Sequence, residues 1–393
     1  ELHASAAGLD VGSGSGSGSG SESGAPAATG TGVGALEHER RGTPRQRGIH
    51  LPRQTMLRHL AVMVAGGAVL YLVTSQLSQY NDVLAGEIGA YVVALAGLSL
   101  LTGTSGQISL GHGAFMAVGA YTLALLMTHT GLNLVLELLA ATGAAATVGL
   151  LVGIPATRLR GPYLAGMTLL VALALPSVAD KWSNTFGGDQ GLATTPPTAP
   201  GSVNPEEWLA WIELAGALVT LVLLANLLQS RFGRSFRAVR DNEVAASLSG
   251  VHVARTKVTA FAVSAACAGL GGAFLALSTG VVSTGEFPLS LSIQLLAAMV
   301  ISGAGSLMGM WWGALLLVYV PQWSTSLSNH FSLGSGTSAY LATIVFGAVL
   351  VVAMIVAPSG IQGGLRRALG YAARRRRSLP ARARQRPAQA GPG

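Results

Sequence analysis

The sequence contains little charge and almost no cysteine, and each shortage excludes a class of protein. Only 10% of the 393 residues are charged, against about 25% in soluble globular domains, so the chain lacks the charged surface of an ordinary soluble enzyme. Its single cysteine, Cys267, cannot form a disulfide within the chain, which excludes a disulfide-rich scaffold and a cysteine-based zinc site. Half of the residues are hydrophobic and the mean hydropathy is +0.52, as in a polytopic membrane protein.

The basic residues are arranged as markers of membrane topology. The formal net charge is +8, which in a soluble chain would suggest nucleic acid binding. Here Lys and Arg fall into short clusters between long apolar runs, and no basic stripe is interleaved with stacking aromatic residues. We therefore expect no nucleic acid partner.

Apolar runs of bilayer-spanning length begin near residue 60. Because about 20 helical residues cross a hydrocarbon core of about 30 Å, we predict an all-α integral membrane protein with about ten transmembrane helices. A polar segment, 180–208, contains four prolines and is predicted to be one large outer loop. The expected spans are 60–78, 83–102, 111–128, 132–153, 162–180, 208–228, 257–279, 288–305, 309–323 and 338–357.

The transmembrane domain is predicted over residues 56–367, between two tails. Residues 1–55 are rich in Gly, Ser and Arg, residues 368–393 are basic, and both tails are predicted to be disordered. If the N-terminus is cytoplasmic, all but one of the 24 Lys and Arg residues lie on the cytoplasmic side, the exception being Lys181. We therefore expect an even number of spans and both termini in the cytoplasm.

The first of three polar interruptions, residues 101–115, is rich in Gly, Ser and Thr. Irregular backbone at membrane depth persists only where protein or a water-filled cavity satisfies its polar groups. One interpretation is therefore a broken or re-entrant element that lines a pathway, with Gln107, Ser109 and His112 as its polar wall. The other is a cytoplasmic turn followed by a Gly and Ala helix face that packs closely on a neighbour.

The second interruption, Arg231 to Gly250, is the longest inner loop. Its arginines recur every three residues with apolar residues between them, which predicts a short amphipathic helix along the membrane face. Asp241 or Asn242 can cap a second small-sided helix that closes at Gly250. That helix could fit a groove on another protein, or the loop could be a connector that faces anionic lipid headgroups.

The third interruption, residues 301–314, again combines Gly and Ser before a Gly and Ala helix face. Interrupted segments in both halves of a chain are typical of an inverted repeat with broken helices. Random placement of the 53 glycines would explain the same pattern.

Few ionisable residues lie inside the expected spans. Glu87, Glu137 and Glu213 are each predicted near the outer surface, where they snorkel or face a wet vestibule. No ionisable pair falls at mid-membrane, which argues against a proton- or sodium-driven carrier. No P-loop motif is present either, so ATP would be hydrolysed by another subunit. We predict no catalytic residue, cofactor or metal ligand in this chain.

Three stretches resemble the permease subunits, in particular the M-type subunit, of branched-chain amino acid ABC importers. They are Gly97 to Thr122, the loop Arg231 to Gly250 with its Phe-Gly-Arg and Arg-Asp-Asn-Glu pieces, and the Gly-x-Gly-Ser region from Phe287 to Gly313. The resemblance covers about residues 84–367, with the three matches in the family's order.

The resemblance implies a set of partners and a set of site residues. The partners are a second permease subunit, two cytoplasmic ATPase subunits that use the ATP, an extracytoplasmic solute-binding protein and membrane lipid. The ATPase-coupling loop would comprise Phe232, Gly233, Arg234, Arg237, Arg240, Asp241, Asn242, Glu243, Ala245, Ala246 and Gly250. The translocation pathway would comprise Gly103, Gly106, Gln107, Ser109, Gly111 and His112, and an outer loop with Gly187, Gly188 and Gly191 would dock the binding protein or form a plain turn.

The expected function is therefore import of branched-chain or related small amino acids across a bacterial cytoplasmic membrane by alternating access. Where the family has a Gly and Glu bearing stretch, residues 170–178 are apolar and contain Pro176. This departure leaves open a permease for urea or short amides. Two further interpretations are an ion-coupled secondary transporter and a non-transporting scaffold.

Overall fold

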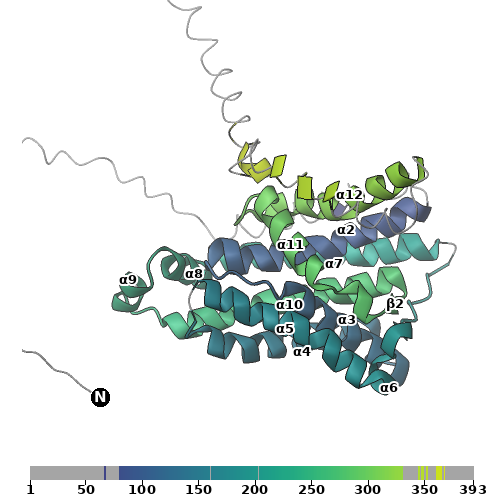
Figure 1. Cartoon of the computed structure of the whole chain (residues 1–393), viewed down its shortest axis with the longest axis horizontal. Helices are drawn as coiled ribbons and strands as arrows, with labels where there is room; N and C mark the ends of the chain where they lie inside the picture. The colour runs from purple at the N-terminus through teal and green to yellow at the C-terminus, as the bar shows by residue number, and fades with distance from the viewer. Residues whose placement is uncertain are drawn as a thin grey trace, which may run out of the picture. The chain divides into compact units, whose positions relative to one another are not determined.

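The computed structural model describes residues 79–330, except 160 and 202, and the short pieces 66–67, 344–345, 347–348, 351–352, 360–364 and 367. Both predicted tails, 1–55 and 368–393, lie outside the described residues. The described part is mostly helical (Figure 1). This agrees with the all-α fold class that the composition and the long apolar runs predict.

The helices and strands follow one another in a simple order. The helices are α2 (Gln79–Leu98), the π-helical η1 (Ser99–Thr104), α3 (His112–His129), α4 (Leu134–Ala156), α5 (Pro162–Lys181), α6 (Ser183–Phe186), α7 (Pro205–Gln229), α8 (Arg231–Asp241), α9 (Glu243–Leu248), α10 (Val253–Thr279), α11 (Leu289–Ser302) and α12 (Met310–His330). Short 3₁₀ turns are η2 (Gly188–Gln190), η3 (Thr284–Glu286) and η4 (Leu307–Gly309), and the strands are β1 (Leu192–Ala193) and β2 (Val281–Val282).

Six helical segments of the described part are long and apolar enough to cross a membrane. They are Gln79–Thr104, Leu134–Ala156, Pro162–Lys181, Pro205–Gln229, Val253–Thr279 and Thr284–Ser302. Helices α3 and α12 lie where two further spans are expected but are not among the six. The expected spans 60–78 and 338–357 fall almost entirely outside the described residues. The total of ten therefore stays a prediction.

Helix α10 is the centre of the bundle and packs against α2, α3 and α4 (Figure 1). Small residues allow the backbones to touch. A methyl group added at Gly119 of α3 would collide with the Gly269 backbone of α10, and one added at Gly272 would collide with the Met116 backbone of α3. Between helices that are surrounded by lipid, the hydrophobic effect does not drive association, and the van der Waals contacts of such close packing stabilise the pair instead.

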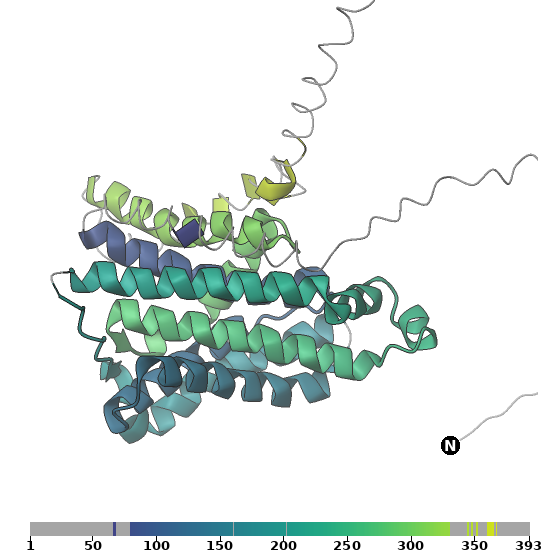
Figure 2. The same cartoon turned by 180° about the vertical axis from the view of Figure 1, so that it is seen from behind.

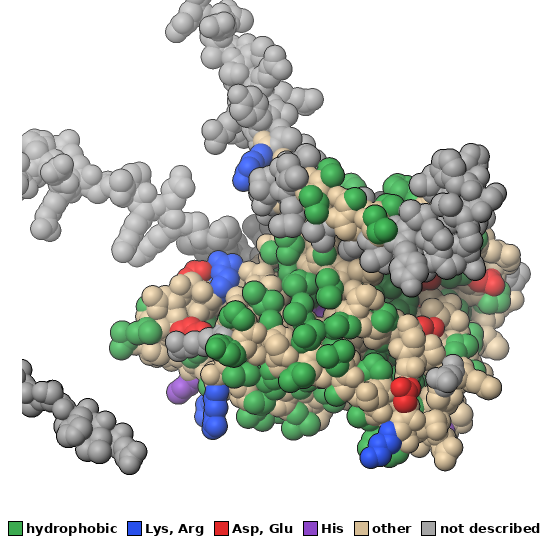
Figure 3. Space-filling view, viewed as in Figure 1, with side chains coloured by type: hydrophobic (Ala, Val, Ile, Leu, Met, Phe, Trp, Pro, Cys, Tyr) green, Lys and Arg blue, Asp and Glu red, His purple; other side chains and the backbone are tan. Residues whose placement is uncertain are grey.

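The exposed surface between the two ends of the bundle is apolar. Helices α4 and α5 are the least buried of the six candidate spans, and they expose Leu139, Leu151 and Leu170. Figure 3 shows hydrophobic side chains across the middle of this face and charged side chains toward its two ends. This distribution suits a protein whose central band contacts lipid.

The proline-rich segment between α5 and α7 is a loop, as the sequence predicts. It contains α6, η2 and β1, and β1 pairs antiparallel with β2, with Leu192 opposite Val282. The Thr194 hydroxyl donates to the carbonyl of Ala276 at 2.8 Å, which fixes the loop to the last turns of α10. The loop therefore closes over the end of the bundle opposite to α8 and α9 (Figure 1).

Glu213 corrects one expectation from the sequence. Instead of snorkelling or facing a vestibule, this residue of α7 is 0% exposed. Ser278 of α10 lies 2.8 and 2.7 Å from its two carboxylate oxygens. At Gly86 of α2 an added methyl group would collide with the same carboxylate. The buried Glu213 side chain thus joins three helices through polar and close-packed contacts.

Candidate functional site

The first glycine-rich interruption is re-entrant. After η1 the backbone is irregular from Ser105 to Gly111, and α3 begins at His112. Nε2 of His112 lies 2.8 Å from the carbonyl of Ala94, which can only accept, so this nitrogen donates. Ala94 precedes the end of η1 by about 15 Å along the helix axis. The chain therefore turns back into the bundle before α3 starts, as the broken-element interpretation expects. The close contact of Gly119 in α3 with Gly269 in α10 also fits the second interpretation, a helix face that packs closely on a neighbour.

Side chains from several helices hold this re-entrant segment (Ser105 to Gly111). The amide of Leu110 donates to Thr168 Oγ1 of α5 at 2.9 Å. Just after the segment, the amide of Gly113 donates to Ser292 Oγ of α11 at 3.0 Å. Nε2 of Gln107 donates to Ser105 Oγ at 2.7 Å and to the carbonyl of Lys257 in α10 at 3.4 Å. The backbone amides of Leu110 and Gly113 thus have hydrogen-bond partners on neighbouring helices, which is what irregular backbone inside a membrane protein needs.

The polar wall expected from the sequence is buried in the single chain. Gln107 is 3% exposed, and Ser109 and His112 are both 0% exposed. Gly106 and Ile108, which alternate with them, are exposed. Gly111 packs so closely on Thr168 of α5 that a side chain at Gly111 would not fit. These residues shape the re-entrant segment, and their role in a pathway stays a prediction.

The first and third interruptions contact each other. The amide of Gly305 donates to Ser99 Oγ of η1 at 3.0 Å, and a methyl group at Gly103 would collide with the Gly305 backbone. Gly303 and Gly305 have φ of 105° and 83°, which glycine adopts without strain. Two segments that the sequence singles out separately are therefore one structural unit. An inverted repeat does not follow from this contact and stays a prediction.

The second interruption forms two helices that project beyond the bundle (Figure 2). Helix α8 is amphipathic, with Phe236 and Val239 buried and its arginines exposed. Asn242, and not Asp241, caps α9: its Oδ1 accepts from the amides of Val244 and Ala245, each at 3.0 Å. Past α9, Gly250 adopts a φ of 82°. The amphipathic helix predicted from the arginine spacing and the second helix predicted from capping are therefore both present, while the course of α8 along the membrane face stays a prediction.

Several charged residues of this loop bond within their own chain, including Arg237, whose Nη1 donates to the carbonyl of Leu228 at 3.3 Å. Arg240 donates through Nη1 to the carbonyl of Gly103 at 2.9 Å and pairs with Asp241 at 3.0 Å. Glu243 Oε1 lies 2.6 Å from Nζ of Lys257 in α10. Arg240 and Glu243 thus connect α8 and α9 to the membrane-embedded part of the chain, in addition to any contact with a partner.

The tip of α9 presents apolar side chains to the outside. Leu248 is 84% exposed and Val244 is 64% exposed. Neither residue is among those selected from the sequence, although two apolar residues on a short helix within a charged loop are a recognisable pattern. Of the remaining predicted coupling residues, those exposed are Phe232, Arg234, Arg237, Ala245 and Gly250, and those buried are Gly233 and Ala246.

The local backbone conformation explains why three positions of the outer loop are glycines. Gly187, Gly188 and Gly191 have φ of 77°, 54° and 72°. Gly188 is the first residue of η2, Gly187 and Gly191 flank it, and Gly191 packs against the carbonyl of Val282 in β2. The plain-turn interpretation is sufficient for these glycines, so docking of a binding protein stays a prediction.

Taken together, the apolar bundle, the re-entrant segment and the projecting helices define a multi-pass membrane protein. Residues 82–354 match the family described as branched-chain amino acid transport system / permease component, and the chain belongs to this family. Within the residues that the structure describes, no cluster of three or more His, Cys, Asp or Glu side chains could hold a metal ion.

Several curated proteins are similar to the chain. It is 32% identical to the high-affinity branched-chain amino acid transport system permease protein LivM of Escherichia coli (strain K12), over 69% of this chain and 67% of that one. It is 24% identical to the permease protein BraD of Pseudomonas aeruginosa, over 70% of this chain and 91% of that one. LivH of Salmonella typhimurium is 28% identical over 49% and 56% respectively. No solved structure matches the chain.

Proposed function

We propose that this protein is the transmembrane permease subunit of an ATP-binding cassette importer for branched-chain or related small amino acids. Family membership and the names of the relatives LivM, LivH and BraD support this substrate class. The chain would work in the cytoplasmic membrane, with α8 and α9 on the cytoplasmic side because the Lys and Arg residues of the loops concentrate there. It would catalyse no reaction itself, since the ATPase partner would hydrolyse the ATP.

The observation that carries the proposal is the convergence of the three interruptions. Arg240 of α8 bonds to Gly103 of η1, and Gly103 packs on Gly305. Glu243 of α9 pairs with Lys257, whose carbonyl accepts from Gln107 of the re-entrant segment. A displacement of α8 and α9 would therefore reach both broken segments through direct contacts. This is a physical route from an external motor to a transport pathway.

The exposed tip of α9 is the proposed contact with the ATPase subunit. Leu248 and Val244 would insert into a groove on that subunit, since an apolar helix face is stable in water only when covered. Arg234 and Arg237 of α8 would add charge at the rim. ATP binding and hydrolysis would move both helices as a rigid unit.

Alternating access would then occur between this chain and a second permease subunit. The buried positions of Gln107, Ser109 and His112 fit such a motion if the re-entrant segment shifts as the pathway opens. An extracytoplasmic binding protein would deliver the solute at the opposite end, over the loop that contains β1.

Uptake of radiolabelled leucine tests this proposal. Membrane vesicles would contain the chain with its neighbouring permease, ATPase and binding protein, and isoleucine and urea would be the competitors. We expect ATP-dependent uptake that isoleucine blocks and that an ATPase-dead partner abolishes. Uptake that survives the dead ATPase and collapses with the ion gradient would instead establish an ion-coupled carrier. Transport of urea without transport of leucine would show that the substrates are urea or short amides.

A further inference from the structure

A pocket of about 200 Å³ lies at the end of the bundle opposite to α8 and α9, under the proline-rich loop. Met127 near the end of α3, Glu137 in the first turn of α4, and Thr195 and Pro197 of the loop contribute to its lining. The preceding residue of the loop, Thr194, bonds to α10. The loop is therefore held over this end of the bundle, and the pocket belongs to the fixed part of the fold.

Glu137 contributes a buried carboxylate to the pocket. The residue is 4% exposed, yet among the residues that the structure describes its carboxylate has no hydrogen bond and no ion pair. Its oxygens are not among the fully enclosed unpaired atoms, so they open into the pocket. Nearly all buried polar groups in proteins are paired, and a buried charge without a partner is destabilising. The carboxylate therefore lacks a partner that a ligand in the pocket would supply.

The packing of α4 gives no reason for a carboxylate at this position. The face of α4 that is turned inward has a buried small residue at every fourth position, namely Ala141, Ala145, Gly149 and Gly153. These residues bring α4 close to α10, since a methyl group added at Gly269 would collide with Ala145. Glu137 is one turn before Ala141 in the same series. It lies in the first turn of α4, where the helix dipole favours a negative charge, so the pocket favours a cation.

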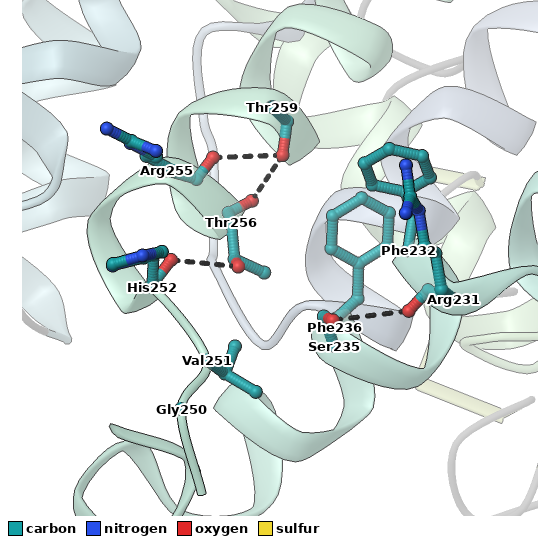
Figure 4. Close-up of a pocket in the computed structure, with 10 residues that line it drawn as sticks. All are labelled: Arg231, Phe232, Ser235, Phe236, Gly250, Val251, His252, Arg255, Thr256 and Thr259. Atoms are coloured by element: carbon teal, nitrogen blue, oxygen red, sulfur yellow. Dashed lines mark hydrogen bonds between the residues drawn. The ribbon is translucent and has the colours of Figure 1, made fainter. Parts of the chain in front are cut away.

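A larger hollow, of about 420 Å³ between α8 and the start of α10, differs from this pocket. Figure 4 shows that the hydroxyls of Ser235, Thr256 and Thr259 bond to carbonyls four residues earlier in the chain. The side chains of His252 and Arg255 point away from the hollow. The polar groups drawn there are thus already paired or directed elsewhere, whereas the Glu137 carboxylate faces its pocket unpaired.

We propose that the pocket binds a primary ammonium group, with Glu137 as its counter-charge. An ammonium has three donors and no acceptor, and the pocket offers the Glu137 carboxylate and the Thr195 hydroxyl as acceptors. Met127 and Pro197 would surround the carbon atoms next to the nitrogen. One carboxylate and one hydroxyl are too few for Ca²⁺, which takes six to eight oxygen ligands. The volume is below the about 300–1,000 Å³ of usual small-molecule sites, so the pocket suits the ammonium end of a ligand.

Two sources present this group at the outer end of the bundle. One is the headgroup of phosphatidylethanolamine, because α4 exposes Leu136 and Leu139 beside Glu137, within two turns of the start of the candidate span. The other is a free amino acid that arrives from outside, and this source rests on the importer function proposed above. The two sources share the ammonium and differ in whether acyl chains are attached to it.

Two binding measurements on the full chain, purified with the subunits that accompany it, test the proposal. Native mass spectrometry compares phosphatidylethanolamine with phosphatidylcholine of identical acyl chains, whose headgroup nitrogen carries methyl groups in place of N–H groups. Thermal unfolding in phosphatidylcholine compares added ethanolamine and leucine, since a ligand of the folded state raises the unfolding temperature. We expect Glu137→Gln to weaken the bound amine at least about tenfold, the usual effect of losing a hydrogen bond to a charged group.

Asp180→Asn is the matched control, because it removes an exposed carboxylate at the same end of the bundle outside the pocket. Selective retention of phosphatidylethanolamine that depends on Glu137 would identify the lipid as the source. Stabilisation by ethanolamine or leucine that depends on Glu137 would identify a free amine. The proposal is overturned if no amine distinguishes wild type from Glu137→Gln, or if Asp180→Asn has the same effect.

Stability without any amine separates a binding site from a structural carboxylate. In phosphatidylcholine alone, Glu137→Gln should be at least as stable as wild type, because the variant has no buried charge to solvate. A lower unfolding temperature of Glu137→Gln would show that the carboxylate serves the fold, and would overturn the proposal. Because these measurements need neither ATP nor transport, a negative result leaves the importer function standing, and failure of leucine uptake leaves the ammonium site standing.

Discussion

Nζ of Lys257 lies 2.6 Å from Oε1 of Glu243, and this ion pair ties the projecting helix α9 to the membrane helix α10. The two partners differ in exposure: the Lys257 side chain is 6% exposed and that of Glu243 is 31% exposed. Water can partly solvate the Glu243 carboxylate but hardly reaches the Lys257 ammonium. The ammonium therefore depends on the carboxylate for its polar contacts.

The asymmetry of this pair leads to the first prediction. Glu243→Gln leaves a buried ammonium without its counter-charge and should destabilise the chain by about 2–3 kcal/mol. This cost is lower than that of breaking a fully buried ion pair, because water reaches the Glu243 side of the pair. Lys257→Met leaves a carboxylate that water can solvate, and should cost less. Thermal unfolding of the two purified variants in detergent measures the difference. Equal losses of stability would contradict the buried-ammonium explanation.

The second prediction concerns the crossing of α3 and α10. Gly119→Ala forces a methyl group against the Gly269 backbone and should destabilise by about 1–3 kcal/mol or prevent folding. Gly143→Ala on α4 is the matched control, because no atom lies within 4 Å of the added group. There the substitution should stabilise by about 0.5–1 kcal/mol, since alanine favours a helix. The yield of monodisperse protein and its unfolding temperature distinguish the two cases.

The third prediction tests the tip of α9. Leu248→Glu should weaken co-purification of the ATPase subunit by at least about tenfold, because truncating a buried interface anchor commonly costs about 2 kcal/mol or more. Leu248→Met keeps the apolar contact and should bind normally. Since Leu248 is 84% exposed in the chain itself, neither change should lower the chain's own thermal stability. Wild-type recovery of the ATPase with Leu248→Glu would exclude the tip as the contact.

Exchange of charge at Arg240 and Glu243 should behave differently from the change at Leu248. Glu243→Lys places two ammonium groups together at Lys257, and Arg240→Glu removes the bond to Gly103. We expect the double variant to lose thermal stability as well as coupled uptake. A double variant that is as stable as wild type would show that these internal bonds contribute little.

The fifth prediction concerns the anchor of the re-entrant segment. Thr168→Val removes the acceptor of the part-buried Leu110 amide and should destabilise the chain by about 1 kcal/mol, the low end of the cost of an unpaired buried amide. Thr168→Ser keeps the hydroxyl and should preserve stability. Uptake should fall with Thr168→Val even at temperatures where the protein remains folded, because the pathway segment would lose its fixed position. Normal uptake at such temperatures would show that Thr168 only supports the fold.

Much of the helical layout follows from the sequence. The expected span 162–180 agrees with α5 at Pro162–Lys181, because an apolar run that begins at a proline also begins a helix. A helix cap at Asp241 or Asn242 and a helix end at Gly250 follow from capping chemistry, and the structure shows that Asn242 is the cap and that Gly250 has a positive φ. These features depend on residues close in the sequence, so local patterns determine them.

Only the tertiary structure decided which distant residues meet. Hydropathy gives no sign that Gly103 touches both Arg240 and Gly305, or that Glu243 faces Lys257 while Leu248 faces outward. The burial of Glu213 against Ser278 is likewise invisible to hydropathy, because depth along a helix does not say which neighbour the side chain faces. The sequence by itself determined that the chain enters a membrane and where its helices break. The packing of helices around α10 decided that the three breaks form one connected unit, because the contacts between them join residues far apart in the chain.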